Sequence, residues 1–554
     1  MSSPPHPLVI SLPESPAGED AGTAGADPRP VQLHVIHDWG GGAARWVEDY
    51  CRADRRRRNL VLKPVADASG IGRRLALCEG PSGAAPIARW KLDPPLVSAA
   101  VTHLQYRAAL REILETWGVE AILVSSLVGH SLDVLSTGLP TAVVLHDYYP
   151  FCPAIHITYR DRRQGGPGAV CASCPPERLA ECLAHNEHHR FFDGLTPGEA
   201  LAVRARFVAL AQSPAVTLVA PSPSVKRHLV ALEPRLAGAN FRVIPHAIAI
   251  PENGPEGDSP TFAARESGQA PAKDGPEGDS PIFAARKLGQ SPARLTAVVL
   301  GRLSPEKGLN LLREALPELS RLCDVVLLGC GRPGRALAGV GVRVIPNYDR
   351  DRLPTILAEL GADFGLLLSV VPETFSYTLT ELIHCRLPPV VVNRGSFADR
   401  IEDGATGFLI APSKEELLGK VKALSERPEC LAAVRRNLEQ IEPRSLEAMV
   451  REYHEVLPLP RFSERRGAVG PCAAVAGRLR AAAAPLATAP LAAAGDRTFE
   501  ARVDEAYAVA RVKVACTPRL RPWQRPLVRL ALAGGYRLVK LGCRLVGRRK
   551  SRAA

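Results

Sequence analysis

Two glutamates eight positions apart, Glu373 and Glu381, bracket the stretch PETFSYTLTE. If a helix begins at Thr374, a rise of about 1.5 Å per residue places the two carboxylates roughly 12 Å apart along its axis. The acid and base carboxyls of glycosidases lie about 5 to 9.5 Å apart, so this spacing disfavours hydrolysis by the pair. We therefore expect the two side chains to hold different hydroxyl-bearing parts of one elongated ligand. The competing interpretation is that both are ordinary helix-start and surface residues.

The residues between the two glutamates predict an anion site. Thr374, Phe375, Ser376 and Tyr377 would present free backbone N–H groups at the start of the helix. Such groups, together with the helix dipole, favour a negative charge, and a phosphate is the expected occupant. The ligand predicted in this way carries a sugar, a phosphate and a ribose.

Two cations precede this stretch, in the sequence VVLGRLSPEKGLNLL. Arg302 offers a planar fork of donors and Lys307 a mobile point charge, a combination suited to two adjacent phosphates. Gly301 and Gly308 allow the backbone to approach a ligand closely. In isolation, an Arg and a Lys in a loop would usually be solvated surface charges.

The elements that position these residues form two series, in which short β-rich runs alternate with helical stretches. The first series begins with VQLHVIHDW, EAILVSSLV and TAVVLHDYY, and the second with LTAVVLGRL, CDVVLLGCG and VRVIPNY. This alternation predicts an α/β fold with parallel sheets covered on both faces by helices. We assign residues 31–250 and 295–440 to two doubly wound, Rossmann-like domains. Ligands of such domains bind in the crevice at the carboxyl ends of the strands.

The remaining segments are assigned from their composition. Residues 1–30 are rich in Pro, Gly and acidic residues, and are predicted to be disordered rather than a signal peptide. Residues 251–294 contain a duplicated 21-residue segment and are predicted to be a linker or insertion. Residues 441–462 are expected to form a closing helix. Residues 463–554 are expected to be a low-complexity stretch followed by a basic amphipathic tail.

The distribution of charge along the chain indicates which partners the protein could bind and where in the cell it would lie. The net charge is +13, and much of the excess lies in the C-terminal tail. A basic helix bordered by Trp523 and Tyr536 would either lie on an anionic membrane or dock on the protein itself. Zinc-finger spacings and RNP-type aromatic motifs are missing, so nucleic acid is not an expected partner. No run of 18 apolar residues occurs, and we expect a cytoplasmic protein that contacts the inner face of the membrane if the tail binds there.

Three motifs carry a resemblance to a known family. GRLSPEKGLNLL, PETFSYTLTE and VVVNRGSFADRIEDGATGFLIAP, in this order, resemble the donor-binding domain of retaining glycosyltransferases of the GT-B fold, family 4, also described as glycosyl transferases group 1. The resemblance is strong over residues 295–430 and looser over residues 31–250. It implies a nucleotide diphosphate-sugar donor, a glycan or lipid-linked acceptor, and no required cofactor.

The resemblance also implies roles for individual residues. Arg302 and Lys307 would neutralise the donor diphosphate, Glu373 would hydrogen-bond the transferred sugar, and Glu381 would hold the ribose hydroxyls. The donor site would be completed by Gly301, Thr374, Phe375, Ser376 and Tyr377.

Two residues depart from the pattern of the family. Ser376 and Arg386 stand where the family commonly has Gly. The change at Ser376 is mild. Arg386 would narrow the crevice or alter the donor preference.

A glycine-rich loop lies in the first domain, where Gly40, Gly41 and Gly42 separate a predicted strand from a predicted helix. Such a loop lets backbone amides approach an anion, although it is not the dinucleotide-binding fingerprint. The resemblance places it beside the acceptor site and the donor phosphates. A simple tight turn is the alternative.

Two histidines follow predicted strands of the first domain, His130 in LVSSLVGHSLD and His146 in VVLHDYYPFCP. Each would either contact the ligand or be a half-buried structural residue. Because a histidine of the family contacts the donor sugar, we assign that role to His130. His146 and Asp147 are expected to shape the acceptor pocket.

Four cysteines follow this motif in the pattern C-x18-C-x2-C-x7-C: Cys152, Cys171, Cys174 and Cys182. They would either hold a structural zinc ion or form a cluster of free thiols or a disulfide. Neighbouring histidines could replace a thiolate ligand, namely His156, His185, His188 and His189.

The sequence therefore predicts a retaining transferase that moves a sugar from a nucleotide diphosphate-sugar to a hydroxyl, in cell-surface polysaccharide or glycolipid synthesis. Two alternatives use the same architecture. One is a nucleotide-sugar epimerase, and the other is a non-catalytic scaffold related to glycosyltransferases.

Overall fold

The computed structural model describes the following residues: 27–67, 70–80, 85–161, 163, 168–189, 192, 194–249, 294–339 and 341–458. The predictions for the N-terminal 26 residues, the duplicated segment and the basic tail lie outside these ranges. Within them, no helix is both long enough and apolar enough to cross a membrane.

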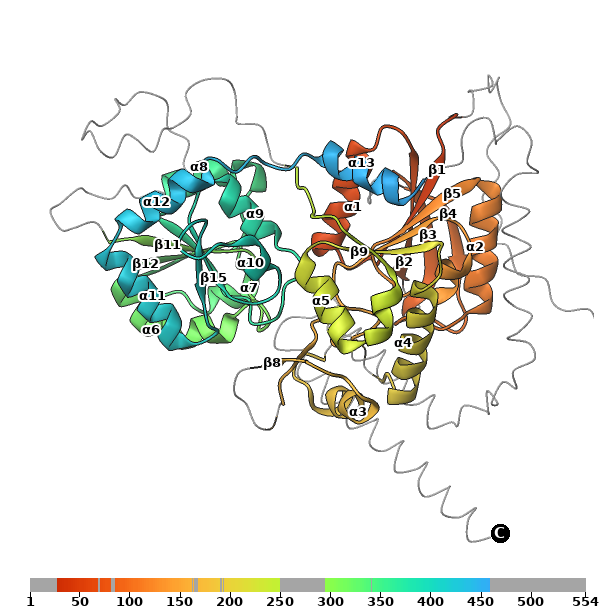
Figure 1. Ribbon diagram of the computed structural model, residues 1–554, viewed down its shortest axis with the longest axis horizontal. Helices are drawn as coiled ribbons and strands as arrows, with labels where there is room; N and C mark the ends of the chain where they lie inside the picture. Colours follow the sequence, from red (N-terminus) through yellow and green to blue (C-terminus); the bar gives the residue numbers. More distant parts are fainter. Residues whose placement is uncertain are drawn as a thin grey trace, which may run out of the picture.

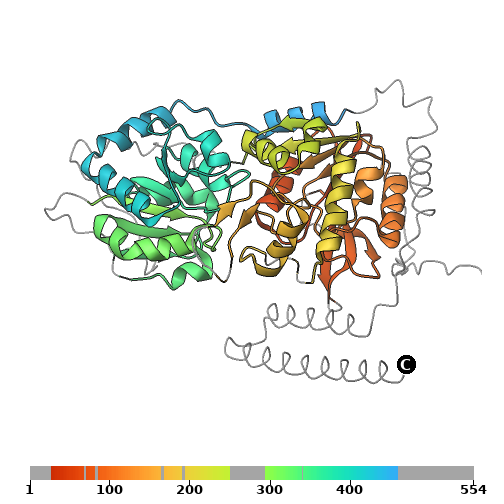
Figure 2. The same cartoon turned by 60° about the horizontal axis from the view of Figure 1, so that its bottom comes forward.

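The described chain forms two α/β domains that lie side by side (Figure 1, Figure 2). The strands of the first domain are β1 (Val31–Val35), β2 (Arg58–Asp67), β3 (Gly70–Glu79), β4 (Pro86–Lys91), β5 (Val119–Val124), β6 (Thr141–Val144), β9 (Val216–Ala220) and β10 (Asn240–Val243). They form one sheet in the order β10-β9-β6-β5-β1-β2-β3-β4. The pairs from β10 to β2 are parallel, whereas β2, β3 and β4 pair antiparallel. This antiparallel edge was not predicted, and it extends a flavodoxin-like strand order.

The second domain has a fully parallel sheet in the order β13-β12-β11-β14-β15-β16. Its strands are β11 (Thr296–Leu300), β12 (Asp324–Leu328), β13 (Val342–Ile345), β14 (Phe364–Leu367), β15 (Pro389–Val392) and β16 (Phe408–Ile410). The central strands are almost continuously apolar and buried, as expected when helices cover both faces. This is the 3-2-1-4-5-6 order of dinucleotide-binding folds, so the predicted pair of Rossmann-like domains is confirmed.

Helices flank both sheets. Those of the first domain are α1 (Gly41–Ala53), α2 (Leu104–Thr116), α3 (Pro176–His185), α4 (Pro197–Ala211) and α5 (Pro223–Leu232). Those that follow β11 are α6 (Leu309–Leu322), α7 (Gly331–Arg335), α8 (Leu353–Glu359), α9 (Tyr377–His384), α10 (Ser396–Arg400), α11 (Lys414–Glu426), α12 (Glu429–Leu438) and α13 (Leu446–Val456). Each sheet has a separate apolar cluster of buried side chains on either face.

Helix α13 follows the second domain in sequence but packs on the first, next to α1 (Figure 1). The indole Nε1 of Trp46 lies 3.2 Å from Sδ of Met449. Arg57 donates to the carbonyl of Leu457 at 2.6 Å, just beyond the end of α13. The chain thus returns to the first domain after completing the second.

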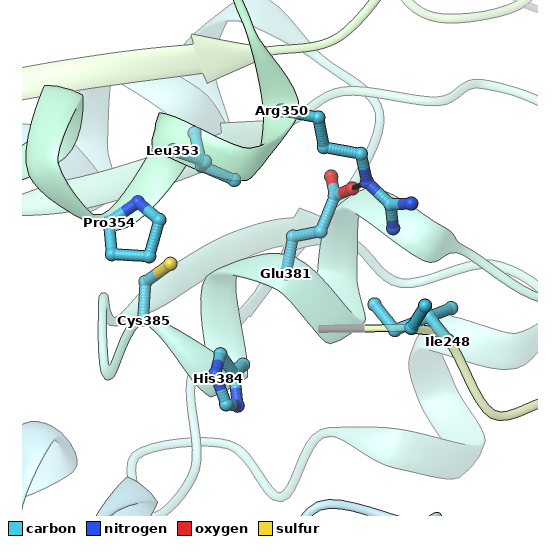
Figure 3. A pocket seen from close by; sticks show the side chains of 8 residues that line it. Ile248, Arg350, Leu353, Pro354, Glu381, His384 and Cys385 are labelled. Atoms are coloured by element: carbon cyan, nitrogen blue, oxygen red, sulfur yellow. Dashed lines mark hydrogen bonds and ion pairs between the residues drawn. The ribbon is translucent and has the colours of Figure 1, made fainter. Parts of the chain in front are cut away.

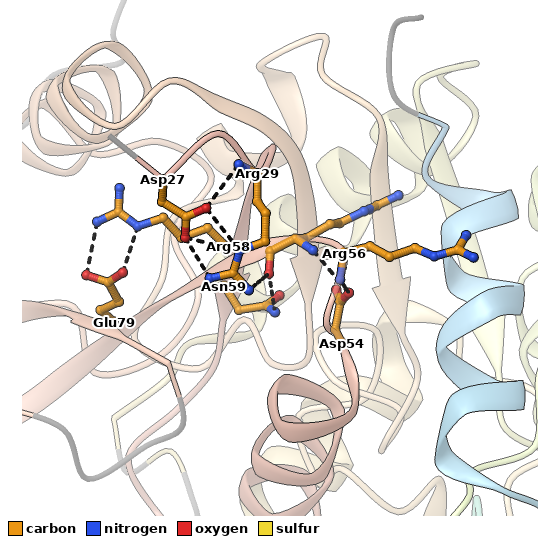
Figure 4. A network of polar contacts seen from close by, with 8 residues as sticks. Asp27, Arg29, Asp54, Arg56, Arg58, Asn59 and Glu79 are labelled. Atoms are coloured by element: carbon orange, nitrogen blue, oxygen red, sulfur yellow. Dashed lines mark hydrogen bonds and ion pairs between the residues drawn. The ribbon is translucent and has the colours of Figure 1, made fainter. Parts of the chain in front are cut away.

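Close to this junction, ion pairs and turns fix the chain around the start of β2 (Figure 4). Arg58 pairs with Glu79 of β3 at 2.7 Å, and Arg29 pairs with Asp27 at 2.6 Å. The carboxylate of Asp54 accepts a hydrogen bond from the backbone N–H of Arg56 at 3.0 Å. These contacts fix the segment before β1 and the turn into β2, and they join β2 to β3.

Both sheets contain a point at which successive crossovers run to opposite sides. In the first sheet it lies between β1 and β5, and in the second between β11 and β14. Ligands of open α/β sheets bind at this place, outside the carboxyl ends of the strands. The Gly40–Gly42 loop follows β1, Arg302 and Lys307 follow β11, and Glu373 follows β14.

Candidate active site

The second domain brings Lys307 and Glu373 into direct contact. Nζ of Lys307 lies 2.5 Å from Oε1 of Glu373, and the hydroxyl of Ser369 donates to the same oxygen. The lysine is about half exposed, whereas the carboxylate side chain is only 11% exposed. The cation predicted to bind phosphate and the carboxylate predicted to bind the sugar therefore form one unit.

Backbone geometry of the preceding loop supports this contact. Gly308 has φ +82° and forms the N-cap of α6, and a Cβ there would clash with the carbonyl of Leu368. Only glycine fits this close approach between the loop and the end of β14. Arg302 is exposed, and within the described part of the chain its guanidinium has no hydrogen bond or ion pair. Gly301 has φ +97°, and a Cβ there would lie 3.0 Å from the side chain of Thr378.

Glu381 has a partner that the sequence did not reveal. Arg350, in the turn before α8, forms an ion pair with its carboxylate (Figure 3). Burial raises the pKa of Glu381, and Arg350 acts in the opposite direction. The motifs gave no signal for Arg350, because it lies 31 residues before Glu381 in a loop of the neighbouring βα unit.

Glu381 also faces a small hollow. Figure 3 shows Arg350 and Glu381 pointing toward each other at its edge. The other lining residues come from α8, the end of α9 and the segment that leaves the first domain: Ile248, Ala249, Leu353, Pro354, His384 and Cys385. A carboxylate with two oxygens at the rim of an apolar hollow is suited to accept hydrogen bonds from two neighbouring hydroxyls.

Helix α9 begins at Tyr377, three residues later than the start considered from the sequence. The side chain of Ser376 caps it by accepting from the N–H of Leu379 at 3.2 Å. Thr374 instead donates its hydroxyl to the carbonyl of His146 in the first domain, at 2.6 Å. The residues before α9 therefore join the two domains, and among the described residues no acceptor is bonded to the backbone N–H groups of Thr374, Phe375 and Ser376.

The glycine-rich loop of the first domain meets this segment. Gly40 and Gly41 have φ of +74° and +80°, and no atom lies near their would-be Cβ positions. At Gly42 a Cβ would come within 3.3 Å of the Tyr377 ring. The starts of α1 and α9 thus face each other across the domain interface.

Aromatic rings fill the space beside this contact. His146 lies 4.8 Å from His246 and 5.2 Å from Trp46, and His246 lies 4.9 Å from Phe375, measured between ring centroids. Burial lowers the pKa of His146 to about 3. Next to it, burial raises the pKa of Asp147 to about 7, although the carboxylate accepts from the N–H of Tyr149 at 2.7 Å.

His130 is fully buried in the first domain. Its Nδ1 lies 3.1 Å from the hydroxyl of Tyr106, and its Nε2 lies 3.0 Å from the carbonyl of Ile36 at the end of β1. Burial lowers its pKa to about 4. Both ring nitrogens are engaged within the protein, and the predicted contact with a donor sugar stays a prediction.

Arg386 occupies a position with φ +54°, directly after α9. Its side chain is exposed and does not line the hollow beside Glu381. A left-handed residue commonly ends a helix and is usually Gly, which accounts for the glycine expected here.

The four cysteines share one small cavity with Phe151, Ile157 and Arg178 as neighbours: Cys152, Cys171, Cys174 and Cys182. All four are free thiols. Within the described ranges, no three or more His, Cys, Asp or Glu side chains are grouped as a metal site. Zinc binding by these thiols stays a prediction.

Comparison with known protein families gives a match over the second domain. Residues 283–440 match the family model described as Glycosyl transferases group 1. The matched segment contains Lys307, Glu373, Arg350 and Glu381. Comparison with curated protein sequences gives no match.

Solved structures with related folds cover most of the chain. Sucrose-phosphate synthase from Thermosynechococcus elongatus has 14% identity and a TM-score of 0.47, over 77% of this chain and 98% of that one. HepE from Anabaena, in complex with UDP, has 17% identity and a TM-score of 0.47, over 77% and 99%. A glycosyltransferase from Rickettsia africae has 14% identity and a TM-score of 0.45, over 78% and 100%. Likeness at this level carries no argument about substrate.

Proposed function

We propose that this protein is a retaining glycosyltransferase that moves a sugar from a nucleotide diphosphate-sugar to a hydroxyl acceptor. The observation that carries the proposal is the contact between Lys307 and Glu373 at the switch point of the domain that matches Glycosyl transferases group 1. In such a donor, the sugar and the diphosphate adjoin. A cation and a carboxylate held side by side suit that junction.

The other residues of the second domain complete the donor site. Arg302, exposed in the same loop as Lys307, adds a second positive charge for the diphosphate. Glu381 accepts hydrogen bonds from the ribose hydroxyls, and the ion pair with Arg350 opposes the effect of burial on the pKa of this carboxylate. The proposed chemistry needs no metal, because Arg302 and Lys307 supply the positive charge.

Catalysis in this proposal is positional and electrostatic. The two cations stabilise the diphosphate as it leaves, while the sugar acquires oxocarbenium character. Contact between the domains orients the acceptor and excludes water that would hydrolyse the donor. Retention, membership of family 4 and an acceptor in cell-surface polysaccharide or glycolipid synthesis follow from the sequence resemblance.

The first domain would supply the acceptor side. Its Gly40–Gly42 loop, His146 and Asp147 all lie at the interface with the segment that precedes α9, or next to it. A carboxyl whose pKa lies near 7 suits hydrogen bonding to a hydroxyl in either protonation state. The predicted membrane contact belongs to the tail, outside the described residues.

The first test is a thermal-shift screen of the full chain against UDP-, GDP-, ADP- and dTDP-sugars. We expect one base to raise Tm and Glu381→Ala to abolish the shift. The second test measures release of the nucleoside diphosphate with and without hydroxyl acceptors. Acceleration by an acceptor supports transfer, whereas interconversion of sugars without an acceptor would show an epimerase. The absence of binding to all four donors would contradict the proposal and favour a scaffold.

A further inference from the structure

A segment of the first domain reaches across to the phosphate-side loop of the second. Residues 148–195 connect β6 to α4 and contain α3 and the short strands β7 (Thr158–Tyr159) and β8 (Ala169–Val170). In Figure 1, β8 and α3 lie below the eight-stranded sheet. Within this segment, His188 is 2% exposed, and its Nδ1 lies 3.5 Å from Oε1 of Glu306. Glu306 directly precedes Lys307, so the segment 148–195 touches the loop of the candidate donor site.

A second histidine of this segment lies beside the same loop. The rings of His156 and His188 are 6.5 Å apart between centroids, with their planes at 86°. Burial lowers the pKa of His156 to about 4, and the charged groups that act on the ring are Glu306, Glu373 and Lys307. His156 therefore belongs to the first domain by sequence but lies one ring away from His188, which contacts Glu306, the residue before Lys307.

The backbone around His156 is held in an unusual conformation. Ile155 and Ile157, on either side of it, have φ of +56° and +46°, a region that β-branched residues rarely adopt. Two hydrogen bonds to backbone carbonyls maintain the turn. The carbonyl of Ile157 accepts from the backbone N–H of Cys171 at 2.8 Å, and the carbonyl of His156 accepts from the side-chain hydroxyl of Thr158 at 3.0 Å. Such strain persists where the surrounding structure fixes it, and it is often found at ligand sites.

We propose that His156 contacts the sugar–phosphate end of the nucleotide-sugar donor, facing Lys307 and Glu373 from the first domain. This inference rests on the proposed function. A lysine only donates hydrogen bonds and an ionised carboxylate only accepts them, whereas a neutral imidazole does both. His156 can thus both donate a hydrogen bond to the nucleotide-sugar and accept one from it, which neither Lys307 nor Glu373 can do. His188, held by Glu306, positions the ring of His156.

The test compares His156→Gln and His156→Ala with the wild-type chain by titration calorimetry, using UDP-glucose and UMP. If the thermal-shift screen selects another base, the counterparts with that base replace them. UMP keeps the ribose but lacks both the second phosphate and the glucose. We expect His156→Ala to weaken UDP-glucose binding about 10-fold and to leave UMP binding unchanged. His156→Gln, which keeps one donor and one acceptor, should retain part of the affinity.

The matched control is His185→Gln, in the last turn of α3 within the same segment. It should bind both nucleotides as the wild type does. Equal weakening of UDP-glucose and UMP by His156→Ala would show that the residue only maintains the domain interface, and would overturn the inference. Unchanged binding of UDP-glucose would overturn it as well. Failure of the wild-type chain to bind any donor would instead contradict the proposed function.

Discussion

Gly42 of the first domain lies against the ring of Tyr377 in the second, so closely that a Cβ would come within 3.3 Å of its Cε2 atom. Tyr377 is the first residue of α9, and Gly42 is the second residue of α1. The contact therefore aligns the N-termini of two helices across the interface, where the first backbone N–H groups have no partner within their own helix. Side-chain size at residue 42 controls how closely the domains approach.

Substitution of Gly42 should separate an effect on domain approach from an effect on folding. A Cβ at 3.3 Å requires only a small shift of the ring, so Gly42→Ala should retain most activity. Gly42→Leu should lower kcat/KM at least about 10-fold, because a misplacement of about 1 Å is costly in catalysis. Combination with Tyr377→Ala should restore part of the loss. Measurement of kcat/KM for the double variant checks this, and the absence of rescue would contradict it.

Removal of Glu381 should affect both binding and stability. Glu381→Ala leaves Arg350 partly buried without its partner, and we expect a loss of about 1–3 kcal/mol in the free energy of unfolding. Nucleotide affinity should fall about 10- to 100-fold. Replacement of both residues, as Glu381→Leu with Arg350→Met, should recover stability but not binding. Denaturant unfolding and calorimetry separate the two quantities, and recovery of binding by the double variant would rule out the ribose role.

The positive charge of Lys307, rather than its packing, should contribute to the binding of a nucleoside diphosphate. Lys307→Ala is expected to weaken binding of a nucleoside diphosphate by about 10- to 100-fold, with less effect on a monophosphate. Lys307→Arg should retain part of the affinity. The control is Lys422→Ala, on the exposed face of α11, where the side chain is 67% exposed. Equal affinity of wild type and Lys307→Ala for the diphosphate would exclude the proposed role.

Asp147 should make stability fall as pH rises. Its pKa is about 7 in the folded protein, against an ordinary value of 3.8, so the folded state binds the proton more tightly than the unfolded state. This contribution is complete below pH 4 and is lost progressively as the pH rises through 7. Asp147→Asn should therefore be more stable than the wild type by about 4 kcal/mol at pH 8, and little different at pH 4. Chemical unfolding at both pH values measures this.

The control for this pH effect is Asp93→Asn, at a carboxylate that is 71% exposed. It should leave the pH profile unchanged. A parallel profile for Asp147→Asn and the wild type would show that Asp147 does not titrate near neutral pH.

The sequence predicted the fold well because its signals were local. Buried strands such as Thr296–Leu300 and Pro389–Val392 are short apolar runs followed by turn residues, and both belong to the predicted parallel sheet. The antiparallel edge formed by Gly70–Glu79 and Pro86–Lys91 was not predicted, because neither strand follows a helix and the βα alternation is interrupted there. The start of α9 was set three residues too early, because the hydroxyl of Thr374 bonds to the other domain.

The sequence predicted only those residues of the candidate site that lie in a recognisable motif or spacing. Lys307 and Glu373 were both identified, but their direct contact depends on the strand order, which places β11 beside β14. Arg350 was missed because an isolated arginine in a loop resembles a surface charge. The sequence indicates His156 only as an alternative metal ligand, since nothing in it shows that the segment 148–195 reaches Glu306.

Helix α13 has a consequence for the integrity of the molecule. The chain passes from the first domain to the second after Ala249 and returns before Leu446. Two covalent crossings therefore join the two domains, and together they resist full separation. A single cut between residues 250 and 293 would therefore leave both halves joined through the C-terminal helix, and the nicked protein would still migrate as one particle.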